Sequence, residues 1–192
     1  AIIHGGPFAN IAQGTNTIIA TKMGLSLSDY VVTEAGFGAD LGAEKFMDIK
    51  CGYGDLSPDA LVVVATIRAL RHHGGAKKDQ YGDASVDRVS VGFSNLEKHI
   101  ENMKKFGLTP VVAINHRVGD TEEEIKVVQE KCAALGVDAV VSMGWATGGN
   151  GAQDIAQAVV NSIESGTNNF KRLYDWNAPV IEKIETIARE IY

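Results

Sequence analysis

The sequence predicts an α/β fold built on a doubly wound, mostly parallel sheet. Four short apolar runs are typical of buried strands, and they lie at Tyr30–Thr33, Leu61–Thr66, Pro110–Ile114 and Asp138–Val141. Their apolar residues are continuous rather than alternating, which favours a parallel sheet covered on both faces. Segments with helical spacing separate the runs, and strands that alternate with helices are typical of right-handed α/β units.

Helix signals occupy the segments between these runs. Apolar residues in the range Phe93–Met103 recur at helical spacing, and Gly107 follows as a C-terminal stop. Thr121 and Glu124 have the spacing of a capping box, which satisfies backbone N–H groups at a helix N-terminus. A further apolar stripe lies within Ile181–Ile191. Each segment is therefore predicted to be a helix.

The composition is that of an ordinary globular chain. It has 192 residues, of which 45% are hydrophobic and 22% are charged. The net charge is −6 with both signs interspersed, which argues against a nucleic-acid surface. No apolar run approaches the roughly 20 residues that span a bilayer, so no membrane partner is expected. Cys51 and Cys132 provide neither a disulfide framework nor a zinc spacing, which favours a cytoplasmic location.

A glycine-rich segment follows the first apolar run. Gly36, Gly38 and Gly42 occupy Thr33–Lys45 and approximate a dinucleotide fingerprint. Glycines at a strand end free backbone N–H groups to face an anion. The alternative is a tight strand–helix turn without a ligand.

Two carboxylates flank these glycines. Glu34 and Asp40 lie where a strand end and a phosphate-binding loop would place Mg²⁺ ligands. The alternative for either residue is a solvated loop acid. His4 stands in another glycine turn, where it could contact a phosphate or a metal-bound water, although a lone histidine is more often structural.

The second apolar run ends in cationic residues. Arg68 and Arg71 lie one helical turn apart, and guanidinium groups there suit a phosphate or carboxylate ligand. The alternative is a surface salt bridge, especially for Arg71. His72 and His73 follow directly, and adjacent histidines without a third ligand at a suitable spacing do not indicate a metal site.

The third and fourth runs also end in polar or glycine-rich turns. Asn115 could place its amide near a purine edge, or it could belong to a helix cap. Trp145 could stack on a flat ring, and Gly148 and Gly149 could form a further anion loop. The alternative is an aromatic side chain packed over a strand–helix turn. Because no G-x-x-x-x-G-K-[ST] motif occurs, an ATP-dependent enzyme would need its main phosphate cradle outside this chain.

Five strings of the sequence resemble the formate–tetrahydrofolate ligase family. They are HGGPFANIA at His4–Ala12, TEAGFGADLGAEKF at Thr33–Phe46, VATIRALRHHGG at Val64–Gly75, FSNLEKHI at Phe93–Ile100 and VVAIN at Val111–Asn115. The strings are long and unusual, and they extend the resemblance over essentially the whole chain. We interpret residues 1–192 as a single α/β nucleotide-binding segment from the middle of a longer family chain.

The resemblance implies an ATP-dependent ligase that joins formate to tetrahydrofolate through formyl phosphate. It implies a P-loop NTPase-like fold that lacks the P-loop segment itself, together with Mg²⁺, a monovalent cation and a cytoplasmic homotetramer. The expected site has catalytic His4 and Arg68, metal-binding Glu34 and Asp40, and nucleotide-binding Gly36, Gly38, Asn115, Trp145, Gly148 and Gly149. Gln13 and Thr147 depart from the family pattern, which expects His and Lys there, and the fragment alone is expected to be inactive.

The competing hypothesis is an NADP-binding oxidoreductase domain built on Gly36, Gly38 and Gly42. A dinucleotide site requires an acidic residue about 20 positions further on, at the end of the next strand. That strand instead ends in Ala65–Thr66, followed by Arg68, so NAD fits poorly and NADP only marginally.

Overall fold

A computed structural model describes residues 14–192, which divide into two compact units. The sheet unit comprises Pro58–Phe170, and the glycine unit comprises the chain up to Ser57 together with Lys171–Tyr192. The predicted site residue His4 lies outside the described residues. The interpretation of residues 1–192 as one nucleotide-binding segment stays a prediction.

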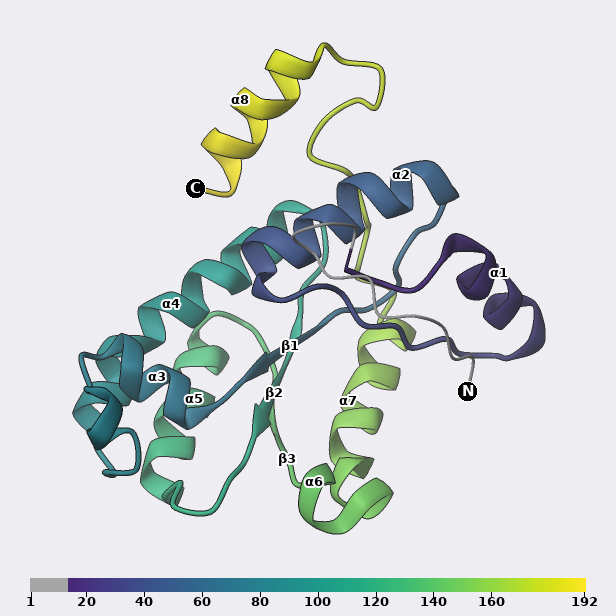
Figure 1. Ribbon diagram of the computed structural model, residues 1–192. Coiled ribbons are helices and arrows are strands. Elements are labelled where there is room, and N and C mark those ends of the chain that lie inside the picture. The colour runs from purple at the N-terminus through teal and green to yellow at the C-terminus, as the bar shows by residue number, and fades with distance from the viewer. Residues whose placement is uncertain (1–13) are drawn as a thin grey trace. The chain divides into compact units, whose positions relative to one another are not determined.

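The sheet unit contains a three-stranded parallel sheet. Its strands are β1 (Val62–Ala65), β2 (Val111–Asn115) and β3 (Ala139–Ser142), in the order β1-β2-β3. In Figure 1, the helices α3 (Ile67–His73), α4 (Val86–Lys105) and α5 (Glu122–Ala134) lie on one side of this sheet, and α7 (Gln153–Glu164) lies on the other. The α/β class and three of the four predicted strands are therefore confirmed, whereas the doubly wound, P-loop NTPase-like arrangement stays a prediction.

The predicted strand at Tyr30–Thr33 is wrong. This segment pairs with no strand among the described residues, and the side chains of Tyr30 and Val32 are 55% and 93% exposed. β-Branched residues favour extended backbone locally, but a strand also needs a neighbour that supplies the ladder hydrogen bonds.

Seven helical elements follow the strands of the sheet unit, of which the first four connect one strand to the next and the last three come after β3. They are α3 (Ile67–His73), a 3₁₀ turn (Lys78–Gln80), α4 (Val86–Lys105), α5 (Glu122–Ala134), α6 (Gly144–Thr147), a second 3₁₀ turn (Gly148–Ala152) and α7 (Gln153–Glu164). The Thr121–Glu124 capping box is confirmed. The predicted face of α4 is buried against the core, with Ile100 and Met103 fully inaccessible.

A buried ion pair joins the helices of the sheet unit. Arg71 on α3 is 2% exposed, and its Nε and Nη2 donate to Glu124 on α5 over 2.8 and 2.6 Å. Arg71 Nη2 also donates to the Gly119 carbonyl, while Glu124 accepts from the backbone N–H of Ser85 and Thr121. Burial alone would raise the pKa of Glu124, but the Arg71 and backbone hydrogen bonds lower it to about 2. The alternative of a surface salt bridge for Arg71 is therefore wrong, because the pair is buried.

The two ends of the sheet unit are tied to the strands by Asn168. Its Nδ2 donates to the Asp59 carbonyl over 2.9 Å, and its Oδ1 accepts from the Thr109 N–H over 2.9 Å. The neighbouring Asn169 N–H donates to the Gly107 carbonyl. The segment that enters the unit before β1 and the segment that leaves it are thus held by the same side chain.

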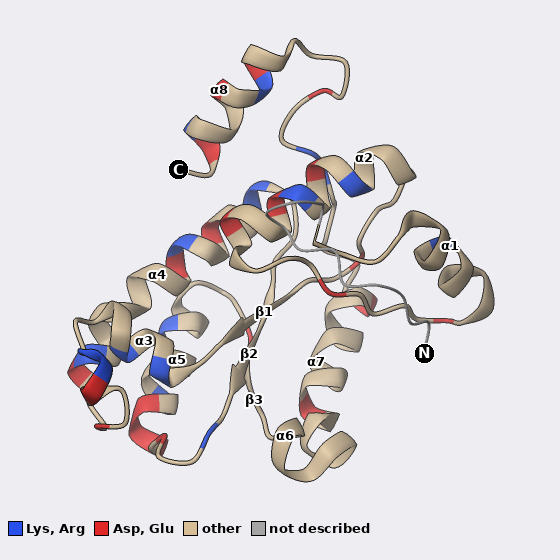
Figure 2. Cartoon of the chain, in the orientation of Figure 1, with Lys and Arg blue, Asp and Glu red and all other residues tan. Residues whose placement is uncertain are grey.

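The glycine unit is helical in its described part. It contains α1 (Ile18–Leu27), two consecutive π-helical segments (Gly38–Ala43 and Lys45–Lys50), α2 (Cys51–Gly54) and α8 (Val180–Glu190). The predicted C-terminal helix is confirmed, but Ile181 and Ile184 on its apolar stripe are 66% and 57% exposed. Acidic and basic residues are interspersed along α8, as they are along α4 of the sheet unit (Figure 2). No helix among residues 14–192 is long and apolar enough to cross a membrane.

Replacing Arg71 by Met is expected to destabilise the protein by about 3–5 kcal/mol, because Glu124 would keep a buried charge without its partner. Adding Glu124→Met should recover much of that loss, since buried ion pairs and apolar isosteres are often similar in stability. Urea denaturation of the complete protein in which this chain occurs measures both. An R71M variant within about 0.5 kcal/mol of the wild type would show that the pair is energetically unimportant.

Candidate functional site

Two predicted nucleotide-binding residues, Asn115 and Trp145, lie at the carboxyl edge of the sheet. Asn115 ends β2 opposite Ser142, the last residue of β3, and the His116 N–H donates to the Ser142 carbonyl over 3.1 Å. The Trp145 indole N–H donates to the His116 carbonyl. The Trp145 side chain is nevertheless 58% exposed. The sheet edge therefore holds the indole at one point and leaves much of its ring accessible.

A glycine turn follows Trp145. Gly148 has a φ of +59°, and a side chain added at Gly148 or Gly149 would meet no atom within 4 Å. Both residues are exposed, so their backbone is accessible to a ligand. Gly151 differs, because a Cβ there would lie 2.3 Å from Thr147 Oγ1 and 2.5 Å from the Met143 carbonyl. Packing thus requires glycine at 151, which ends the predicted glycine-rich turn but is not among the predicted site residues.

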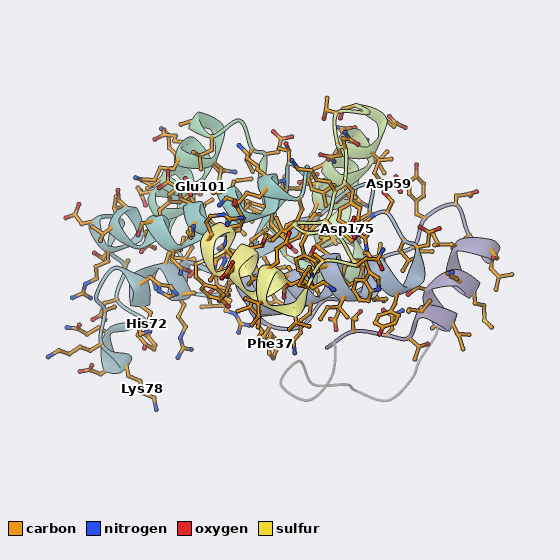
Figure 3. All side chains as sticks on the ribbon, turned by 90° about the horizontal axis from the view of Figure 1, so that it is seen from above. Phe37, Asp59, His72, Lys78, Glu101 and Asp175 are labelled. Atoms are coloured by element: carbon orange, nitrogen blue, oxygen red, sulfur yellow. The ribbon has the colours of Figure 1, made fainter. Side chains whose placement is uncertain are left out.

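Arg68 lies on the surface of the sheet unit. Thr66 caps α3 by accepting from the Ala69 N–H, so Arg68 is in the first turn of that helix. Its guanidinium carbon lies 5.1 Å from the centre of the Tyr81 ring. The Tyr81 hydroxyl is in turn 2.8 Å from Nδ1 of His72, which is exposed and labelled in Figure 3. Arg68 is therefore held by stacking and has no ion-pair partner among the described residues.

The predicted glycine segment folds back on itself in the glycine unit. Gly38 has a φ of +77°, and a Cβ at Gly42 would lie 1.7 Å from the Gly36 carbonyl oxygen. Phe37 between them is 97% exposed (Figure 3). The segment continues into π-helical turns. Such turns are rare in proteins as a whole, and those that occur are often found at functional sites. A dinucleotide fingerprint instead requires a strand before the glycines and an α-helix after them.

The two predicted metal ligands belong to this same segment. Glu34 is exposed, and its backbone carbonyl accepts a hydrogen bond from the Thr15 hydroxyl over 2.8 Å. Asp40 is half-buried, and its carbonyl accepts from the Tyr192 hydroxyl over 3.4 Å. Within residues 14–192 no three His, Cys, Asp or Glu side chains gather into a metal site. One or two carboxylates still suit Mg²⁺, which commonly completes its shell with water and substrate phosphates.

The structure also contains a buried pair of carboxyl groups that the sequence reasoning missed. Glu44 is 6% exposed and Asp48 is inaccessible, and Asp48 Oδ1 accepts from the Leu173 N–H over 2.9 Å. Burial raises the pKa of Glu44 to about 7, and the charge of Asp48 adds to this shift. Burial also raises the pKa of Asp48. The spacing of four residues was the only signal in the sequence.

Lys50 is a second buried charge that the sequence reasoning missed. Its side chain is 3% exposed, and Nζ donates to Thr15 Oγ1 and Asn16 Oδ1, each over 3.2 Å. The ammonium also lies 4.8 Å from the centre of the Phe46 ring. Burial lowers the pKa of Lys50.

Eight of the ten predicted site residues thus form two groups. Glu34, Gly36, Gly38 and Asp40 lie together in the glycine unit, and the sheet unit brings Asn115, Trp145, Gly148 and Gly149 to the end of its central and outer strands. Arg68 follows the end of β1 separately.

Glu44→Gln is expected to stabilise the protein at high pH. The folded-state pKa of Glu44 is raised from 4.5 to about 7, so its contribution to stability is complete below pH 4.5 and is lost as the pH rises through 7. Glutamine resembles the protonated acid, so the variant should gain on the order of 3 kcal/mol over the wild type at pH 8 and little at pH 5. Urea denaturation at both pH values measures this difference. The exposed Glu101→Gln is the control, and equal behaviour of the two variants would contradict the assignment.

Comparison with known proteins places the chain in a family. The family model "Formate--tetrahydrofolate ligase" matches residues 1–192. A protein of Pelagibacter ubique (strain HTCC1062) named formate–tetrahydrofolate ligase is 56% identical over 192 residues, which cover 100% of this chain and 34% of the relative. The chain thus spans about a third of the length of the relative that it matches. On the match over its whole length, the chain belongs to the formate–tetrahydrofolate ligase family.

Proposed function

We propose that the protein containing this chain ligates formate to tetrahydrofolate at the expense of ATP. The products are 10-formyltetrahydrofolate, ADP and phosphate, with formyl phosphate as the intermediate. The observation that carries this proposal is the family match over all 192 residues, together with 56% identity to a protein of that name. Neither comparison supports the alternative NADP-binding oxidoreductase, and the π-helical turns after the glycines also disfavour it.

The glycine unit would hold the metal and part of the phosphate chain. Glu34 and Asp40 flank a loop whose glycines expose its backbone, so their oxygens are suited to Mg²⁺, and Gly36 and Gly38 to phosphate oxygens. Mg²⁺, when bound, would neutralise charge on the transferring phosphoryl group. The exposed Glu34 carboxylate and its fixed carbonyl support this role.

The sheet edge would bind the nucleotide. Trp145 offers an exposed ring whose N–H is already bonded to His116, so the ring can stack on a base without leaving a polar group unpaired. Asn115 directly precedes His116 in the sequence, and it lies at the strand end, where α/β sheets commonly bind ligands. The accessible backbone of Gly148 and Gly149 supports an anion contact.

Arg68 and His4 would act on the reacting groups. A guanidinium held only by ring stacking can turn toward a phosphate, and there it would stabilise charge that develops during phosphoryl transfer. His4 lies outside the described residues, and its contact with a phosphate or a formyl oxygen rests on the sequence alone. In this proposal the complete protein is a P-loop NTPase-like enzyme, and it is a cytoplasmic homotetramer that uses a monovalent cation.

The complete protein is expected to release ADP from Mg-ATP only when formate and tetrahydrofolate are both present. The physical reason is that the acyl phosphate forms only with formate and is consumed only by the folate amine. A coupled ADP assay with each substrate omitted in turn measures this dependence. NADP-dependent turnover without ATP would refute the proposal.

Trp145→Ala is expected to weaken Mg-ATP binding by roughly 5- to 150-fold, because base–aromatic stacking contributes about 1–3 kcal/mol. Trp145→Phe should lose less, since it keeps a ring. Isothermal titration of the complete protein measures the two Kd values. Trp176→Phe is the matched control, because it alters the other tryptophan, in the glycine unit. Equal affinities of W145A and W176F would exclude stacking on Trp145.

A further inference from the structure

Lys50 is a buried cation whose described partners are all neutral. Its ammonium contacts Thr15 Oγ1, Asn16 Oδ1 and the Phe46 ring, and no carboxylate pairs with it among residues 14–192. Buried lysines are rare unless paired, because the charge loses its hydration. Arg71, in the other unit, shows the usual solution, since Glu124 neutralises it. The retention of an unpaired lysine therefore needs a reason other than stability.

The ammonium fixes the direction of the hydrogen bonds around it. A protonated lysine has donors only, so its partners must turn acceptors toward it. Thr15 Oγ1 accepts from Lys50 and donates its one hydrogen to the Glu34 carbonyl over 2.8 Å, a shorter contact than the 3.2 Å to Asn16 Oδ1, which itself accepts from Lys50. Asn16 turns Oδ1 to Lys50, and its Nδ2 donates to the buried Thr21 hydroxyl over 2.8 Å.

These bonds connect the two ends of the glycine segment. Glu34 precedes the glycines at 36–42, and Lys50 ends the π-helical segment that follows them. The two hydrogen bonds from Lys50 to Thr15 and from Thr15 to Glu34 therefore link the residue before the glycine segment to the residue after it. In each bond the donor and the acceptor are defined. A neutral amide at position 50 would allow either direction, because it both donates and accepts.

We propose that Lys50 is a positioning residue, whose donor-only ammonium sets the Thr15–Glu34 hydrogen bond and thereby holds the backbone from which the glycine segment begins. Its effect on catalysis rests on the proposed function, in which Glu34 and these glycines bind Mg²⁺ and phosphate. The effect of Lys50 on the backbone is independent of the proposed function.

The test compares Lys50→Met, Lys50→Gln and the control Lys22→Met, which replaces an exposed lysine on α1 of the same unit. Hydrogen–deuterium exchange of the complete protein is measured over residues 14–24 and 33–44, together with the urea midpoint. We expect K50M to speed exchange in both segments by roughly tenfold or more, because a hydrogen bond to a charged donor can shift a local opening by that factor. K50Q should restore part of the protection, K22M should resemble the wild type, and the urea midpoint of K50M should not fall.

Kinetics provide the second readout. K50M should raise the KM for Mg-ATP more than it lowers kcat, with K50Q intermediate. A K50M variant that exchanges like the wild type in residues 14–24 and 33–44 would overturn the proposal. So would faster exchange spread over residues 58–170 with a lower urea midpoint, since that pattern marks a purely structural lysine. If the wild type lacks ligase activity while K50M still loosens the two segments, the proposed function fails and the positioning role stands.

Discussion

The buried Arg71–Glu124 pair is the interaction on which the rest of the sheet unit depends. Helices α3 and α5 cover the same side of the sheet, and this pair joins them through two hydrogen bonds. The same two side chains bind the Gly119 carbonyl and the Thr121 N–H, which lie in the loop after β2. The ion pair thus helps to fix the loop that begins at His116, whose carbonyl accepts from the Trp145 indole.

The glycine unit also buries ionisable side chains, but in its described part they do not form an ion pair with one another like that of Arg71 and Glu124. Glu44 and Asp48 are two acids at one buried place, and Lys50 is a base without an acidic partner among the described residues. Such groups lower the stability of a fold, because each prefers its neutral form when water is removed. Stability lost in this way commonly accompanies a functional site. These buried ionisable groups lie in the same unit as the glycine segment.

The sequence predicted best what depends on local signals. The strands at 62–65, 111–115 and 139–142 and the Thr121 cap all follow from apolar runs and capping residues close together in the chain. The strand expected at Tyr30–Thr33 failed because pairing depends on distant partners. Burial was missed for the same reason: nothing near Arg71, Glu44 or Lys50 in the sequence shows which helix will cover it. The grouping of Asn115 with Trp145 was predictable, because the ends of parallel strands meet at one edge.

The two ends of the sheet unit, held together by Asn168, have a consequence for how the molecule assembles. The glycine unit is discontinuous, since Ser57 and Lys171 belong to it but are separated by the whole sheet unit. Bringing such distant residues together from an open chain costs loop-closure entropy. Because Asn168 binds Asp59 and Thr109, a folded sheet unit would hold its own two ends together and would shorten that search. The sheet unit behaves topologically as a guest inserted into a host, and the host is expected to fold second.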